Sequence, residues 1–270
     1  MERTWRIIAD EPKDAYYNMA KDEALLFSYK KSRIPVFRIY SWDSPSVSIG
    51  YRQKARDVLN IKTCRKLKIP FVRRITGGGA ILHNKEITYS IICSIDDLEL
   101  SRRVKESYKA LNSFLINFYK GFGLNASFAC DIHKNIKPVP VDICFMGFEP
   151  FDIVIEGKKA GGNAQRRSKR IVFQHGSIPL EVDYAMMHSL FKDSKRPETN
   201  IFCFKNIINE RKNYGFLQES LKYSFAAAFN VRFKNIPMTS AENDILKDLL
   251  YSKYYKETWN FNNEKSVLAQ

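Results

Sequence analysis

Three consecutive glycines, residues 77–79, follow the stretch Arg73-Arg74-Ile75-Thr76 and lie between two strand candidates, 71–74 and 80–83. Because glycine has no Cβ, such a loop can adopt positive φ angles and lets a ligand approach its N–H groups closely. The two arginines beside it could hold an anion. The run matches neither G-x-x-x-x-G-K-[ST] nor G-x-G-x-x-G, so the usual nucleotide-binding motifs do not apply. The spacing alone fits a glycine-containing hairpin with solvated arginines equally well.

The hydrophobic pattern around this loop predicts short strands mixed with longer helices. In the helix candidate 103–119, for example, Val104, Tyr108, Leu111 and Phe118 share one face. The strand candidates are 5–9, 36–40, 47–51, 71–74, 80–83, 87–93, 151–155, 171–173 and 177–180, and the helix candidates are 14–31, 103–119, 183–192, 215–229 and 241–254. This order indicates an α+β fold with mixed sheets and flanking helices, because strict βαβ alternation is absent. We expect a single domain over residues 1–262 and a loose polar tail over 263–270.

A second glycine-rich segment, 157–167, follows the strand candidate 151–155 and carries Lys159 together with Gly162, Asn163 and Ala164. Residues 158–170 contain six lysines and arginines and no acid. This composition predicts a loop that binds an anionic partner, although a basic surface hairpin has the same composition.

The five cysteines, at positions 64, 93, 130, 144 and 203, are odd in number and form no C-x-x-C pair. A disulfide framework and a cysteine-based zinc site are therefore not expected, and four scattered histidines favour no metal site either. With no apolar run near the ~18–20 residues that span a bilayer, and a polar N-terminus, we expect a cytoplasmic protein without a membrane segment. Cys144 precedes the strand that leads to Lys159. A nearby cation lowers a thiol pKa, so Cys144 is a candidate nucleophile as well as a candidate buried hydrophobe.

The charge balance is strongly basic, with 44 Lys+Arg against 29 Asp+Glu, or a formal net charge of +15. Such a surplus favours a negatively charged partner. Composition alone leaves nucleic acid and an acidic protein open as that partner.

Seven segments in this order resemble the lipoate–protein ligase and octanoyltransferase family. The helix at 18–26 is similar to N-M-A-x-D-E-A-L-L, and residues 40–53 resemble Y-x-W…S-x-G-Y-x-Q. The glycine run at 73–83 is similar to R-R-x-T-G-G-G/R-A-x-x-H, and 86–90 to E-L-T-Y-S. Residues 157–164, 174–178 and 257–261 resemble G-K-K-x-x-G-x-A, Q-H-G-S-I and a closing E-W-N. The resemblance implies the fold of biotin and lipoate protein ligase catalytic domains, with an acyl tunnel beside the glycine loop.

The family performs two chemistries. Ligases activate free lipoate with ATP, whereas transferases take octanoyl from acyl carrier protein through an acyl-cysteine. Cys144-Phe145 resembles the C-F pair of the LipM-type octanoyltransferases, and only about ten residues follow the E-W-N match, so the accessory domain typical of ligases is not expected. The resemblance therefore implies an octanoyltransferase of lipoate biosynthesis. An ATP-dependent ligase, with a separate accessory subunit, is the alternative, and a basic nucleic-acid-binding module is a remote one.

The resemblance implies Cys144 and Lys159 as the catalytic pair, with no cofactor and no metal; ATP and magnesium would be needed only by a ligase. Its implied partners are octanoyl-acyl carrier protein and a lipoyl-domain acceptor such as GcvH or a 2-oxoacid dehydrogenase E2, not nucleic acid or a membrane. Both partners are typically acidic, so we expect them to dock at 158–170. Asn163 replaces the family's usual serine, and His83 is expected to be structural rather than a base. The implied substrate-binding residues are Arg73, Arg74, Thr76, Gly77, Gly78, Gly79, Ala80, His83, Gly162, Asn163 and Ala164.

Overall fold

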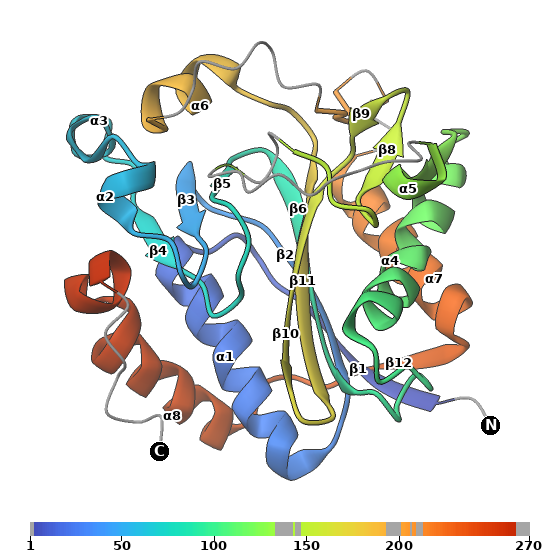
Figure 1. Ribbon diagram of the computed structural model, residues 1–270. Coiled ribbons are helices and arrows are strands. Elements are labelled where there is room, and N and C mark those ends of the chain that lie inside the picture. The colour runs from blue at the N-terminus through green and yellow to red at the C-terminus, as the bar shows by residue number, and fades with distance from the viewer. Residues whose placement is uncertain are drawn as a thin grey trace.

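The computed structural model describes residues 3–132, 143, 147–192, 201–205, 207–208 and 213–262. At its centre is a six-stranded sheet with the order β10-β11-β6-β2-β1-β12 (Figure 1). Strand β1 runs parallel to β2 and β12, and the remaining pairs are antiparallel, so the sheet is mixed. The strands are β1 (Arg3–Ala9), β2 (Val36–Tyr40), β6 (Glu86–Ser94), β10 (Gly162–Ser168), β11 (Ile171–Pro179) and β12 (Val231–Asn235).

Helices cover both faces of this sheet (Figure 1). On one face, α1 (Ala15–Ser32) and α8 (Ser240–Leu249) pack against β-strand residues such as Tyr40 and Ile92. On the other, α4 (Val104–Lys120) and α7 (Tyr214–Phe229) pack against Phe37 and Tyr89. Every residue of β6 is buried as a result, including the polar residues Glu86, Thr88 and Ser90.

Local sequence fixes the helix ends. The Asp14 carboxylate accepts a hydrogen bond from the Tyr17 N–H at 2.8 Å and caps α1, which ends at Arg33 with φ 56°. Thr239 and Glu242 form a capping box at the start of α8. After α8 the helix continues as the π-helical segment η2 (Leu250–Tyr254), and a second one, η3 (Thr258–Asn262), follows.

Two three-stranded sheets flank the large one. The first contains β4 (Phe71–Arg73), β3 (Ser46–Ile49) and β5 (Ile81–His83), and it lies beside α2 (Ala55–Val58), α3 (Ile61–Lys66) and α6 (Tyr184–Leu190) (Figure 1). The second contains β7 (Ala126–Phe128), β8 (Ile153–Ile155) and β9 (Lys158–Lys159), next to α5 (Ala129–Ile132) and α4. The glycine loop 77–79 connects β4 to β5.

The predicted α+β class with mixed sheets is confirmed. The expected loop at 157–167 is wrong in detail, because it holds β9 and the seven-residue strand β10, and the two candidates 171–173 and 177–180 form the single strand β11. Pairing with β11 stabilises β10 although its sequence, G-N-A-Q-R-R-S, has few strand-forming residues. Elements β7, β12, α2, α3 and α5 were not predicted, since they are short or lie at an edge. The expected tail, 263–270, lies outside the described residues.

Candidate functional site

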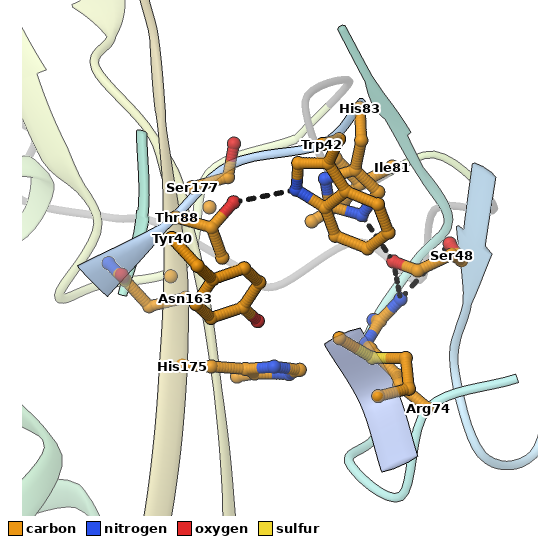
Figure 2. Close-up of a pocket in the computed structure, with 15 residues that line it drawn as sticks. Tyr40, Trp42, Ser48, Arg74, Ile81, His83, Thr88, Asn163, His175 and Ser177 are labelled. Carbon is orange, nitrogen blue, oxygen red and sulfur yellow. Dashed lines mark hydrogen bonds between the residues drawn. The ribbon is translucent and has the colours of Figure 1, made fainter. Parts of the chain in front are cut away.

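A small, mostly apolar pocket lies between the large sheet and the β4-β3-β5 sheet (Figure 2). Its space measures about 30 Å³, enough for about one or two water molecules. In Figure 2, Ser48 and Arg74 lie on one side, and Tyr40 and His175 face them from the other. The lining residues are Met19, Tyr40, Trp42, Ser48, Arg74, Gly78, Ile81, His83, Thr88, Gly162, Asn163, Ala164, His175, Gly176 and Ser177.

Glu86 organises one wall of the pocket. Its Oε1 lies 2.8 Å from His83 Nδ1 and accepts a hydrogen bond from Thr88 Oγ1 at 2.6 Å, while Oε2 accepts from Ser177 Oγ at 2.8 Å. The other ring nitrogen of His83 lies 2.7 Å from Ser48 Oγ, and the Trp42 indole stacks on the imidazole at 3.8 Å. Since both ring nitrogens of His83 have partners and the ring is buried, the geometry favours a structural role for it.

Asp22 organises a second part of the wall, on the large sheet. Its carboxylate contacts the Arg38 guanidinium at 2.7 Å and accepts a hydrogen bond from the Tyr40 hydroxyl at 2.9 Å. His175 Nδ1 lies 3.8 Å from the same carboxylate, and its Nε2 lies 2.6 Å from Thr76 Oγ1. Burial lowers the pKa of His175, which favours the neutral imidazole. The predicted residue Thr76 thus lies behind the pocket rather than in its lining.

The glycine loop forms the outer rim. Arg74 donates hydrogen bonds from Nη2 to the carbonyl oxygens of Gly77 and Gly79 at 2.7 and 2.8 Å. These bonds hold the loop against the end of β4, from which it starts. Gly78 has φ 88°, and an ideal Cβ on Gly50 would lie 2.0 Å from the Gly78 oxygen. The loop therefore rests directly on the chain that leaves β3. Gly77 and Gly78 are exposed, whereas Ala80 is buried.

Arg73 lies outside the pocket lining, unlike Arg74. Its side chain is completely buried, and its guanidinium donates only to backbone oxygens in the contacts that we identify. A group engaged in this way acts as an anchor between chain segments rather than as an anion site. The acceptors are the carbonyl oxygens of Gly50, Tyr51, Gln53, Trp259, Asn260 and Phe261.

Lys159 is buried at the end of β9, with 3% of its surface exposed, and its ammonium lies 2.6 Å from the Asp152 carboxylate. The same ammonium donates to the Gly147 oxygen at 2.9 Å. Sequence reasoning missed Asp152. The sequence signal was the Glu156-Gly157 pair, and in the structure both residues have positive φ and close a two-residue hairpin between β8 and β9. In this hairpin Lys159 pairs with Val154, and Asp152, two residues before Val154, lies on the same face.

Asn163 and Gly176 are directly paired across β10 and β11. The Asn163 Oδ1 accepts a hydrogen bond from the Tyr89 hydroxyl at 2.6 Å, and its backbone oxygen accepts from Tyr108 at 3.0 Å. In Figure 2 the Asn163 side chain extends away from Arg74, on the other side of the strands from His175, as expected for neighbouring strand positions. Its amide fills the space that a side chain at 176 would need.

Cys144 lies outside the described residues. Its chain neighbour Ile143 is described: it is buried and forms a parallel backbone bridge with Ala80, the residue after the glycine loop.

The six basic residues of 158–170 do not form one surface. Lys159 is buried with Asp152, Arg170 pairs with Asp96, and Arg167 donates to the carbonyl oxygen of Arg102 at 2.9 Å. Lys158 and Arg170 lie on either side of β10, the seven-residue strand Gly162–Ser168, which spans about 20 Å. The single docking patch expected there is wrong.

Within the described part of the chain, no group of three or more His, Cys, Asp or Glu side chains is placed to hold a metal ion. Nor does any helix described here have the length and apolar character needed to cross a bilayer.

Known proteins share both the sequence and the fold. The family model of the lipoyl protein ligase A/B catalytic domain matches residues 14–211. Octanoyltransferase LipM of Halalkalibacterium halodurans is 34% identical over 275 residues, covering 96% of this chain and 99% of that protein. Octanoyltransferase LipM of Bacillus subtilis is 31% identical with the same coverage of both proteins.

Among solved structures, a bi-partite lipoate protein ligase from Thermoplasma acidophilum superimposes with a TM-score of 0.81 at 21% identity, covering 99% of this chain and 100% of that chain. Lipoate-protein ligase A bound with ATP gives a TM-score of 0.80 at 25% identity, covering 97% and 99%. The first of these similarities concerns the fold alone.

Proposed function

The chain belongs to the lipoyl protein ligase A/B catalytic-domain family, and from this premise we propose that it is an octanoyltransferase. It moves an octanoyl group from octanoyl-acyl carrier protein to a lysine of a lipoyl-domain protein, such as GcvH or a 2-oxoacid dehydrogenase E2, in lipoate biosynthesis in the cytoplasm. The observation that carries the proposal is the similarity to octanoyltransferases over almost the whole chain.

In the first step, the Cys144 thiolate attacks the carbonyl carbon of the donor thioester. A bond forms between the cysteine sulfur and that carbon, the bond to the donor sulfur breaks, and the carrier leaves as a thiolate that takes up the proton which Cys144 gave up. Support comes from Ile143, the residue before Cys144. A backbone bridge to Ala80 holds Ile143 at the base of the glycine loop. A thioester already carries the activation energy of the acyl group, so the proposal needs neither ATP nor a metal.

In the second step, the amine of the acceptor lysine attacks the same carbonyl carbon. An amide bond forms, the bond to the Cys144 sulfur breaks, and the proton of the amine returns to that sulfur. In both steps a negative charge develops on the acyl oxygen, and the ammonium of Lys159 stabilises it together with backbone N–H groups. The Asp152 carboxylate compensates the charge of this buried ammonium until the acyl oxygen develops its own.

The octanoyl chain occupies the pocket beside the glycine loop, where each buried methylene contributes about 0.8 kcal/mol. The open space of about 30 Å³ is smaller than eight carbons, so the lining side chains must move when the chain enters. The direct contacts of the substrate are proposed for Arg74, the loop residues 77–80 and the start of β10, residues 162–164. Arg73, Thr76 and His83 support the pocket walls.

The proposal is tested by incubating the protein with octanoyl-acyl carrier protein and measuring its intact mass. We expect one octanoyl adduct on the wild-type protein, none on Cys144→Ala, and loss of the adduct when an unmodified lipoyl domain is added. An adduct of equal amount on Cys144→Ala would overturn the proposal.

A lipoate ligase is the second candidate. The fold matches that of a lipoate-protein ligase A bound with ATP, and the two sequences are 25% identical. That activity would appear as lipoylation from free lipoate that requires ATP and survives Cys144→Ser.

A further inference from the structure

A strongly basic stretch with exposed side chains lies between β3 and β4, on α2 and α3 and the turns beside them. Residues 52–68 contain seven lysines and arginines and one acid, Asp57. All seven cationic side chains are exposed. We call them the α2–α3 surface: Arg52, Lys54, Arg56, Lys62, Arg65, Lys66 and Lys68.

This charge is not neutralised within the part of the chain that the structure describes. None of the ion pairs found among those residues involves a member of the α2–α3 surface. By contrast, the cations at Lys85, Arg103 and Arg170 each lie next to an acid. Seven like charges close together repel one another, so such a surface destabilises the free protein and favours a negatively charged partner.

The α2–α3 surface begins at the rim of the pocket. Its first residue, Arg52, comes four residues after the pocket-lining Ser48 and two after Gly50, on which the exposed Gly78 rests. Figure 1 shows α2 and α3 beside β3, on the side of that strand away from the large sheet. A molecule bound to this surface therefore lies next to the glycine loop.

Arg73 fixes this arrangement. Its Nη1 donates to the backbone oxygens of Gly50, Tyr51 and Gln53, at 3.1, 2.9 and 2.5 Å. The guanidinium is completely buried, so the turn that leads from the pocket rim into α2 is held by hydrogen bonds from the protein interior. These hydrogen bonds fix the turn that joins the pocket rim to the start of the α2–α3 surface.

We propose that the α2–α3 surface docks an acidic face of the protein that carries the octanoyl donor. The inference rests on the proposed octanoyltransferase function. The donor must thread its acyl chain past the glycine loop while the chain is still attached, and so it approaches on this rim. Leu67, between Lys66 and Lys68 and 47% exposed, adds an apolar contact to the surface.

The test uses the full-length protein and its double variant Lys62→Glu/Lys66→Glu, which reverses two charges one helical turn apart on α3. The matched control is Lys30→Glu/Lys31→Glu, at the exposed end of α1. The rate of octanoyl transfer to the enzyme is measured with two donors, octanoyl-acyl carrier protein and the neutral small thioester octanoyl-N-acetylcysteamine. Transfer from the loaded enzyme to a lipoyl domain is measured separately.

We expect the α3 variant to lose roughly tenfold in kcat/KM with the carrier-protein donor, with a weaker salt dependence, and to react with the small thioester like the wild type. The control variant keeps wild-type rates with both donors.

Equal losses with both donors, equal losses in the two variants, or a loss only in transfer to the lipoyl domain would each overturn the proposal. So would tight binding of a random DNA duplex that the α3 variant abolishes while its carrier kinetics stay unchanged. If the wild type forms no adduct with either donor, the proposed octanoyltransferase function is wrong. The docking surface is then tested by comparing the affinity of the carrier protein for the wild type and for the α3 variant.

Discussion

The ammonium of Lys159 and the carboxylate of Asp152 lie 2.6 Å apart, and both side chains are almost completely buried. Asp152 also accepts a hydrogen bond from the Glu149 N–H at 2.7 Å, while its own N–H donates to the Glu149 oxygen at 3.0 Å. The same carboxylate therefore compensates the lysine charge and closes the turn before β8. A cation held in this way is fixed in place before any substrate arrives.

Replacement of Asp152 by Asn leaves this buried ammonium without its counter-charge. Breaking one half of a buried pair costs roughly 3–5 kcal/mol of stability, and octanoyl transfer should fall with it because the Lys159 side chain loses the carboxylate that holds it in place. Chemical denaturation and the rate of adduct formation measure the two effects.

The double variant Asp152→Asn/Lys159→Met removes both charges and keeps a side-chain oxygen that can accept from the Glu149 N–H. We expect its stability to recover to within about 1–2 kcal/mol of the wild type, while octanoyl transfer does not recover. Wild-type transfer by Asp152→Asn, or by the double variant, would contradict the role given to the pair.

Asn163→Ser introduces the residue that the family resemblance led us to expect and removes the acceptor of the buried Tyr89 hydroxyl. An unsatisfied buried hydroxyl costs about 1–3 kcal/mol, so the variant should unfold at lower denaturant concentration. Combining it with Tyr89→Phe should recover part of that loss, since the hydroxyl is gone. If the stability losses of the two single variants, Asn163→Ser and Tyr89→Phe, add up in the double variant, the hydrogen bond contributes nothing to stability.

Gly50→Ala should displace the glycine loop, since the new Cβ would lie 2.0 Å from the Gly78 oxygen. We expect a loss of about 1–3 kcal/mol in stability and a larger effect on octanoyl transfer, because the loop forms the rim of the pocket. Gly77→Ala is the matched control for stability, since a Cβ there meets nothing within 4 Å. Similar behaviour of the two variants would show that the contact is unimportant.

The pair Arg6–Glu242 predicts a dependence of stability on acid pH. Although burial opposes ionisation, hydrogen bonds from Arg6 and the Thr239 N–H hold the pKa of Glu242 at about 2, against 4.5 for the ordinary side chain. The carboxylate therefore binds a proton more readily in the unfolded chain, and its contribution is lost as the pH falls from about 4.5 to about 2. Urea denaturation across this range should show a steeper loss for the wild type than for Glu242→Gln. Parallel curves would contradict the assignment.

The sequence alone determined the α+β class, most helices and the segments that build the pocket. Amphipathic periodicity and capping residues such as Asp14 act over a few residues, so they can be read locally. The glycine run and the resemblance in seven segments also pointed to the family and to Lys159 without any coordinates. Strand β10 could not be predicted, because its polar sequence becomes a strand only through pairing with β11.

Tertiary structure alone decided what the charged residues do. Arg73 and Arg74 are neighbours and equally basic, yet the fold buries Arg73 among six carbonyl oxygens and places Arg74 in the pocket lining. The basic stretch 158–170 looked like the docking surface, but the fold disperses it, and the cations of α2 and α3 remain exposed and unpaired with acids in the described chain. Charge is a local property of the sequence, whereas its neutralisation depends on which distant groups the fold brings within about 4 Å.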